Sequence, residues 1–475
     1  MTSNGLQPHL DFFAHHNPVF YYVYSIPQYI FGPSFIAGRL TSLFFILCSF
    51  ILVYIIARRL SGIFAAFLAG AFLTLNFFST SYFVTVSYHP LESLFMVLFF
   101  FFLTCGIKEK YKYSLCTITL LLAVGTRYLT DISVVFLLLF FIFLYLKKKE
   151  VSFSLRTQIL IACCAFILFI MPYINILERL IFQIIQFNIF STRNAEDPIY
   201  KELIKSVFFF RFLLLEKLTG NFLPVLIVNF SIGTGIIWLG LRDRKRLFQL
   251  WNENAVLFLM VIFVTISELF YQIPLISWPV TRLYYFPVAC IAAGVFWEKL
   301  ASSSKDNLLK PAFYILPVVL ILFSVFIQEK PAVRASWETA HLNYLGKVAN
   351  YVAANTPVDA EIFTFDPPFV IEANRDLSLR MLMETWQIFP EMPTEKCRKY
   401  GLINIDMILT ELNSRNPYAL VLKKPGRLDD NGGKGRILIP YRDAIWKSIN
   451  SNYYLAHSVP MKKDVDGVVN IYFRK

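Results

Sequence analysis

Charged residues are scarce in this chain. They make up 16% of its 475 residues, whereas a typical soluble domain carries about 25%. Hydrophobic residues reach 56% and aromatic residues 17% of the chain. The shortage of charge therefore excludes an ordinary soluble globular protein.

Several chemical signatures are absent as well. Of the seven cysteines, Cys397 stands alone in a polar tail, and the others (Cys48, Cys105, Cys116, Cys163, Cys164 and Cys290) fall in or beside apolar runs. This distribution offers neither a disulfide framework nor a zinc-binding spacing. The sequence has no phosphate-binding glycine loop and no ATP motif, because "GIIWLG" lies within an apolar run and "NGGKGR" in a turn. No nucleotide cofactor is therefore expected.

What the chain does have is a series of apolar runs, each close to the ~20 residues that span a bilayer. Membrane helices are predicted at residues 36–57, 61–79, 91–106, 113–129, 131–146, 157–177, 221–241, 254–271, 281–298 and 311–327. The fold class is therefore a polytopic α-helical membrane protein with a C-terminal α/β domain.

Basic residues indicate how these helices are oriented. The bursts "ARRLSG", "KEKYK", "KKKE", "RDRKR" and "EKLASSSKDNLLK" all fall on one side if the chain alternates across the membrane. Such loops are typical of the cytoplasmic side, so the net charge of +13 is a topology signal and does not predict binding of nucleic acid. All six histidines fall on the opposite side under this topology.

Three parts follow from these patterns. Residues 1–35 are predicted to form an outer loop with an interfacial amphipathic helix, and residues 36–328 a transmembrane domain of about ten helices with an outer loop at 178–220. Residues 329–475 are predicted to form an extracytoplasmic α/β domain, because helical spacing in "NYLGKVANYVAANT" and "INIDMILTELNSRN" alternates with the strand-like "EIFTF", "YALVL" and "VVNIYF".

The first of these parts carries a concentration of reactive side chains. The stretch "HHNPVFYYVYSIPQYIFG" is too aromatic and polar to span a bilayer with ease, and its tyrosines suit a helix at headgroup depth. It would hold Asp11, His15, His16 and Asn17 at the outer membrane surface, where the phosphate of a lipid headgroup lies.

On these residues the chain resembles the C-type (GT-C) glycosyltransferases. The similarity is to the branch with dolichyl-phosphate-mannose protein mannosyltransferases and lipid A aminoarabinose transferases. It rests on Asp11, the turn from His15 to Pro18, Tyr21 and Tyr22, Phe31 and Gly32, Arg39, and the helix end from Ala57 to Gly62. Looser matches are "VGTRYLTDISVVFLLL", "TRLYYFPVACIAAGV" and "GKVANYVAANTPVDAEIFTF".

The resemblance implies a hexosyl- or pentosyltransferase that uses a polyprenyl-phosphate-linked donor on the extracytoplasmic face, with a lipid, glycan or protein acceptor. A bacterial inner membrane is the expected location, in contact with membrane lipids. Asp11 is the candidate base, and Arg127, Arg282, His15 and His16 are candidates for binding the donor phosphate. His89, Glu92 and Arg193 are candidates for an acceptor site or for a divalent metal ion.

Other interpretations stay open at this stage. Arg127 can instead pair with Asp131, and an acid such as Glu92 is stabilised by the helix dipole in any case. Members of the family carry a further helix and an acidic pair upstream, whereas only fourteen residues precede His15 here. We therefore expect either a truncated start or Asp11 in place of that pair. An inactive or scaffold homologue and a secondary transporter are the alternative functions.

Overall fold

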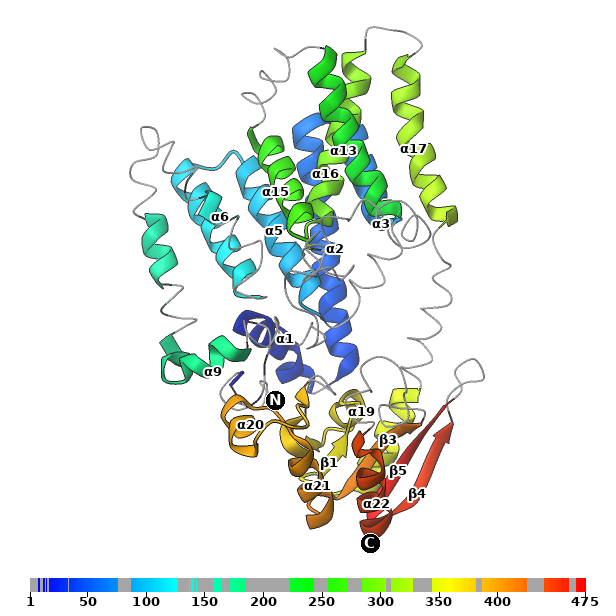
Figure 1. Ribbon diagram of the computed structural model, residues 1–475. Helices are drawn as coiled ribbons and strands as arrows, with labels where there is room; N and C mark the ends of the chain where they lie inside the picture. The colour runs from blue at the N-terminus through cyan, green and yellow to red at the C-terminus, as the bar shows by residue number, and fades with distance from the viewer. Residues whose placement is uncertain are drawn as a thin grey trace.

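A computed structural model describes residues 7–8, 12, 14, 17–32, 34–75, 87–126, 136, 138–140, 142, 157–164, 167, 171–183, 223–242, 255–271, 284–304, 309–327, 344–381, 387–424, 440–460 and 467–475. Figure 1 shows a bundle of long helices with a smaller α/β unit at one end. The short helix α1 lies between the two parts.

The helices of the bundle follow the apolar runs of the sequence. They are α1 (Pro18–Phe31), α2 (Phe35–Ser61), α3 (Ile63–Thr74), α5 (Tyr88–Thr104), α6 (Glu109–Val124), α13 (Leu223–Arg242), α15 (Ala255–Tyr271), α16 (Phe286–Ser303) and α17 (Leu309–Ile327). By length and hydropathy, α2 is the one helix in the described part of the chain that could cross a membrane, and the apolar stretches of the other helices are shorter.

Helix α16 occupies the centre of the bundle. It packs against α2, α3, α13, α15 and α17. Its approach to α3 is close because Gly294 has no side chain, and a Cβ there would lie 2.5 Å from the carbonyl oxygen of Ala65. Aromatic rings fill the space beside α16: those of Phe136 and Phe263 meet with centroids 4.8 Å apart.

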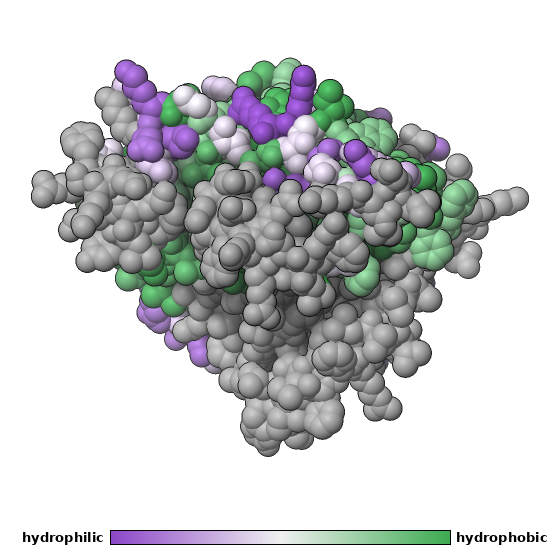
Figure 2. Space-filling view, turned by 90° about the horizontal axis from the view of Figure 1, so that it is seen from above, coloured by the Kyte–Doolittle hydropathy of each residue, from purple (hydrophilic) through white to green (hydrophobic). Residues whose placement is uncertain are grey.

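Helices α2 and α5 run in the same direction, because Tyr24 contacts Ser42 and Ser87 near their starts and Arg59 contacts Cys105 at their ends. The N-terminus of α2 contacts the α/β unit, because Glu372 accepts a hydrogen bond from the backbone N–H of Phe35 (2.6 Å). Basic residues gather at the other end, where α2 finishes with the exposed Arg58 and Arg59 and α6 begins beside Lys108. Figure 2 looks onto this end and shows hydrophilic side chains among apolar ones. The described basic residues therefore lie where the sequence predicts a basic side.

The α/β unit is built on a five-stranded sheet with the order β2-β1-β3-β5-β4. Its strands are β1 (Glu361–Thr364), β2 (Asp376–Leu377), β3 (Ala419–Lys424), β4 (Tyr453–Pro460) and β5 (Val468–Arg474). Strand β1 pairs in parallel with β2 and β3, and β5 pairs antiparallel with β3 and β4.

Side chains alternate between the two faces of this sheet. Ile362 and Val421 belong to one apolar cluster, with the helix at residues 344–355, and Phe363 and Leu420 belong to the other, with α21 (Ile405–Ser414) and α22 (Arg442–Asn452). The shorter elements are α19 (Pro368–Glu372), η6 (Ser378–Arg380) and α20 (Thr394–Tyr400). The unit is thus a sheet with a core on each face.

One predicted membrane helix differs from the structure. Residues 157–177 are predicted as a single span, but Met171–Ile176 form a 3₁₀ helix, η2, which is followed by the short helix α9 (Leu177–Ile181). Pro172 lies in the first turn of this 3₁₀ segment and has no N–H for a continuing α-helix. Figure 1 shows that α9 lies beside the α/β unit, at the level of α1.

Candidate functional site

The candidate site lies where α1, α5 and α6 come together. Helix α1 begins at Pro18, whose fixed φ suits the first helical turn. Asn17 precedes it but does not cap it, because its side-chain amide donates to the carbonyl of Val124 (2.5 Å). The N–H of Val19 donates to the carbonyl of Gly125 (2.9 Å). Two hydrogen bonds therefore fix the start of α1 to the end of α6.

A buried tyrosine attaches the same helix to α2 and α5. The hydroxyl of Tyr24 donates to the carbonyl of Ser87 (2.8 Å) and lies 2.7 Å from the hydroxyl of Ser42. Its ring packs edge-to-face on Phe45, with centroids 5.8 Å apart. Because Ser87 immediately precedes α5, this tyrosine positions the first turn of that helix.

The N-terminal part of α5 holds two of the residues predicted as site candidates, His89 in the first turn and Glu92 just after it. His89 is 3% exposed and Glu92 is fully buried. Their spacing of three residues puts them on one face of the helix. The helix dipole favours a negative charge at this end. The ring of His89 also lies against Tyr88, with centroids 4.0 Å apart.

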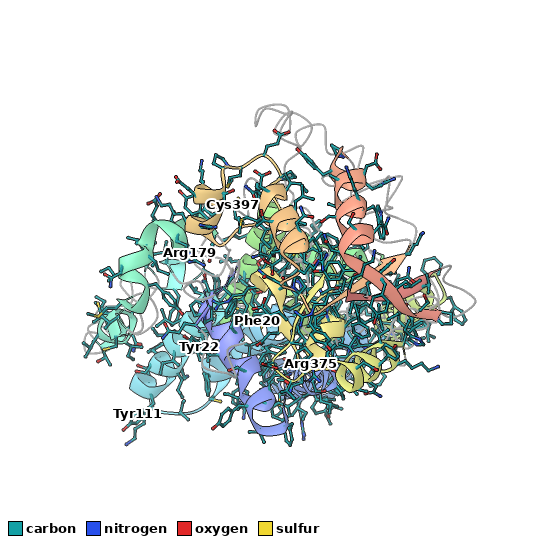
Figure 3. The ribbon with its side chains drawn as sticks, turned by 90° about the horizontal axis from the view of Figure 1, so that it is seen from below. Phe20, Tyr22, Tyr111, Arg179, Arg375 and Cys397 are labelled. Atoms are coloured by element: carbon teal, nitrogen blue, oxygen red, sulfur yellow. The ribbon has the colours of Figure 1, made fainter. Side chains whose placement is uncertain are left out.

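The exposed face of α1 is apolar and aromatic. It consists of Tyr22, Ile26, Tyr29, Ile30 and Phe31, each at least 42% exposed. The hydroxyl of Tyr22 lies 3.3 Å from that of Tyr173 in η2, so α1 and η2 meet at the same level. Figure 3 views this level from the side of the α/β unit and shows Phe20 and Tyr22 on α1. The aromatic belt predicted from the sequence is consistent with this arrangement.

The α/β unit closes the site on the side of α9. The ring of Phe182, just beyond α9, stacks on Tyr400 at the end of α20 (centroids 4.0 Å apart). Glu178 pairs with Lys399 (2.7 Å) and accepts a hydrogen bond from the hydroxyl of Tyr400 (2.9 Å). These two bonds lower the pKa of the Glu178 carboxyl and raise the pKa of Lys399 and of Tyr400.

Of the residues predicted as site candidates, the structure describes His89 and Glu92, which are buried and lie three residues apart near the N-terminus of α5. The other candidates lie outside the described residues: Asp11, His15, His16, Arg127, Arg193 and Arg282. Described neighbours show what some of these candidates lie next to along the chain. Asn17, directly after His16, donates to the carbonyl of Val124, three residues before Arg127. Tyr284, two residues after Arg282, donates to Ser267 (2.8 Å). Sequence reasoning missed Asn17 and Gly125 as contact residues; the Asn-Pro pair signals a helix start but not its distant partner.

In the part of the chain that the structure describes, candidate metal ligands do not form groups of three, and the cysteines form no disulfide. No three His, Cys, Asp or Glu side chains are grouped there as a ligand set. His89 and Glu92 thus supply two candidate ligands. All seven cysteines are free, as their distribution in the sequence predicts, and burial raises the pKa of Cys397 to about 11.

Comparison with known proteins identifies the fold. Residues 15–175 match the family model of dolichyl-phosphate-mannose-protein mannosyltransferase. ArnT from Cupriavidus metallidurans bound to undecaprenyl phosphate is 13% identical, with a TM-score of 0.54 over 97% of this chain and 88% of that one. The apo state of the same protein gives 14% identity and a TM-score of 0.53 over the same shares.

An oligosaccharyltransferase from Archaeoglobus fulgidus is more distant, with 13% identity and a TM-score of 0.48 over 95% of this chain and 65% of that one. No curated protein matches the sequence significantly. The helices of the bundle, the α/β unit at its end and the matched N-terminal segment confirm the resemblance stated from the sequence: the chain has the fold of the GT-C glycosyltransferase superfamily.

Proposed function

We propose that this protein transfers a sugar from a polyprenyl-phosphate-linked donor to a lipid, glycan or protein acceptor. The name of the matching family model, a mannosyltransferase, supports sugar transfer. The undecaprenyl phosphate bound to ArnT supports a polyprenyl-phosphate donor. Hexosyl and pentosyl groups both fit this proposal.

One observation carries the proposal. The start of α1, the end of α6 and the first turn of α5 meet through the bonds Asn17–Val124 and Tyr24–Ser87, beside the buried Glu92. A fully buried carboxylic acid is costly to maintain. Glu92 lies within residues 15–175, the segment that matches the family model, and its position supports a site at this end of the bundle.

We further propose a multi-pass topology in a bacterial inner membrane. The three proposed domains are residues 1–35, 36–328 and 329–475. Arg58, Arg59 and Lys108 support a cytoplasmic location for the basic end of the helices. The contact between Phe35 and Glu372, at the opposite end of α2, supports an extracytoplasmic location for the α/β unit. The exposed aromatic face of α1 suits the membrane–water interface.

The proposed reaction is a displacement at the anomeric carbon of the donor. The acceptor oxygen forms the new bond while its proton passes to the carboxylate of Asp11, and the polyprenyl phosphate leaves with the electron pair of the broken bond. His15, His16, Arg127 and Arg282 are proposed to bind that phosphate, and Arg193 to contact the acceptor. The bond between Val19 and Gly125 supports this grouping, since it joins the chain segments that carry His16 and Arg127.

A divalent metal ion is a further component of the proposal. His89 and Glu92 would hold it as an imidazole nitrogen and a carboxylate oxygen. When bound there, the ion would neutralise developing negative charge on the leaving phosphate.

Sugar transfer can be measured with the purified protein in lipid nanodiscs and a radiolabelled polyprenyl-phosphate sugar. We expect Asp11→Asn and Arg127→Ala to abolish transfer. Asp359→Asn and Arg58→Ala are matched controls, because both change exposed residues away from the proposed site. Full activity of Asp11→Asn and Arg127→Ala would refute the assigned roles. Donor binding without transfer by the unaltered protein would instead identify a scaffold homologue.

A further inference from the structure

Gln183 is a fully buried residue with two partners far away in the sequence. Its side-chain oxygen Oε1 accepts a hydrogen bond from the backbone N–H of Ala14 (3.4 Å). Its side-chain nitrogen Nε2 donates to the backbone carbonyl of Tyr400 (2.7 Å). One carboxamide therefore joins the N-terminal segment to the α/β unit.

The chemistry of the two partners fixes the orientation of this amide. An N–H can only donate and a carbonyl oxygen can only accept. A flipped side chain would set Nε2 against the N–H of Ala14 and Oε1 against the carbonyl of Tyr400, so both bonds would be lost. The bridge thus requires a side chain that accepts on one side and donates on the other, as glutamine does.

On one side, the bridge is fixed to the α/β unit. Phe182 stacks on Tyr400, and a Cβ at Gly401 would lie 2.7 Å from Nη2 of Arg179. The close approach is possible because Gly401 lacks a side chain and has a positive φ of 70°. Figure 3 shows Arg179 next to the part of the unit that carries Cys397. The segment around Gln183 is therefore held by several contacts.

On the other side, the bridge reaches the segment that contains the candidate base. Phe12 and Ala14 are buried, with 3% and 0% exposure. The ring of Phe12 packs edge-to-face on Tyr21 (centroids 5.8 Å apart). Ala14 is the residue directly before His15 and lies three positions after Asp11 in the sequence. A bond at Ala14 therefore restrains the backbone between these candidates.

We propose that Gln183 is a positioning residue, whose carboxamide ties the segment with Asp11 and His15 to the α/β unit. The role of this segment in sugar transfer rests on the function proposed above, whereas the tie itself does not. A shift of about 1 Å in a catalytic group can lower the rate on the order of 100-fold. Release of Ala14 should therefore slow the reaction step, and because His15 and His16 follow Ala14 it should also weaken binding of the donor phosphate.

Two variants of Gln183 and one control test this role. Gln183→Met keeps the length of the side chain and removes both bonds. Gln183→Glu keeps an acceptor for Ala14 but sets a carboxylate oxygen against the carbonyl of Tyr400. Gln387→Met is the matched control, because Gln387 is also buried (2% exposed) and donates to the neighbouring carbonyl, that of Gly401 (2.8 Å), within the α/β unit.

The first readout is hydrogen–deuterium exchange of peptides that cover residues 7–17, with folding checked by gel filtration. We expect faster exchange in both Gln183 variants and unchanged exchange in Gln387→Met. The second readout is transfer kinetics, where we expect kcat to fall about 10- to 100-fold in the Gln183 variants and the KM for the donor to rise, with both unchanged in Gln387→Met.

The outcomes separate this inference from the proposed function. Unchanged exchange in folded Gln183→Met, which lacks both bonds, would overturn the tie, whatever the activity. Faster exchange with an unchanged kcat would overturn the positioning role, and so would an equal loss of kcat in Gln387→Met. If the unaltered protein transfers no sugar, the proposed function fails, and the exchange measurement still decides whether Gln183 holds the segment.

Discussion

The N–H of Val19 donates to the carbonyl of Gly125 at 2.9 Å, and a Cβ added to Gly125 would lie 2.6 Å from Cγ2 of Val19. The hydrogen bond and the close contact fix the start of α1 against the end of α6. Gly125 has a φ of −70°, which any residue can adopt. The absence of a side chain is needed here for space and not for backbone conformation.

Gly125→Ala is therefore expected to displace the start of α1. Overpacking of this kind costs about 1–3 kcal/mol, so the midpoint of thermal unfolding should fall and sugar transfer should decrease. Val19→Ala removes the clashing methyl group, and the double variant Val19→Ala/Gly125→Ala should regain part of the loss. Differential scanning fluorimetry and transfer assays on all three variants measure this coupling. Strictly additive effects would show that the contact is not the cause.

A second prediction concerns the buried acid of α5. Glu92→Gln keeps the size of the side chain and removes its charge, so kcat is expected to fall on the order of 100-fold with little change in stability. Ser93→Ala, also at a fully buried position, is the neighbouring control and should stay active.

The proposed metal ion can be tested on the same proteins. EDTA should abolish transfer by the unaltered protein, and added Mn²⁺ or Mg²⁺ should restore it. His89→Ala and Glu92→Gln should then need more metal for half-maximal activity. Full activity in EDTA would remove the metal ion from the proposal, and full activity of Glu92→Gln would remove this acid from the site.

The apolar runs of the sequence predict where the described helices of the bundle lie, although only α2 among them is long and apolar enough to span a membrane. Contacts between distant segments are different. Gln183 and Tyr400 are 217 positions apart, and Asn17 and Val124 are 107 apart. A single glutamine or asparagine has no local pattern that reveals such a partner, so these residues could not be found before the fold was known.

In the α/β unit, too, some strands are predicted from the sequence and others are not. Strands β1, β3 and β5 are predicted because they are apolar and largely buried. Strand β4, in contrast, lies at the sheet edge and buries only Tyr453 and Val459. An edge strand with few buried residues lacks the alternation on which such predictions depend. Strand β2 has just two residues, too few for any period to appear.

A fourth prediction concerns the pH dependence of this unit. The pKa of Glu361 is raised, first because burial penalises its charged form, and then because the carboxylates of Glu411 and Asp376 repel it; Arg380 opposes the shift. An acid whose pKa is higher in the folded state destabilises the fold as the pH rises above its ordinary pKa of about 4.3. Charge at Glu361 is thus unfavourable at neutral pH.

Glu361→Gln is therefore expected to raise the unfolding midpoint at pH 7. The gain should be much smaller near pH 4, where the glutamate is largely protonated in both states. Since Glu361 remains exposed at the start of β1, we expect a small gain that decreases with added salt. Glu391→Gln, at an exposed turn, is the control. An equal gain at pH 4 and pH 7 would contradict the electrostatic cause.

The last prediction concerns the centre of the bundle. A Cβ at Gly294 of α16 would lie 2.5 Å from the carbonyl oxygen of Ala65 and 3.1 Å from the backbone nitrogen of Ala69. Because both atoms belong to the backbone of α3, no side-chain rotation can relieve the contact, and the two helices must separate. Small residues at a helix crossing permit such close packing in membrane proteins.

Gly294→Ala should therefore lower the unfolding midpoint in detergent, since the overpacking cost of about 1–3 kcal/mol outweighs a gain in helix propensity of about 1 kcal/mol. Gly233→Ala is the matched control, because a Cβ at that position in α13 meets no atom within 4 Å. It makes the same substitution within a helix and should leave the midpoint unchanged or raise it. Equal effects of the two variants would mean that α3 and α16 do not approach each other as closely as Gly294 and Ala65 indicate.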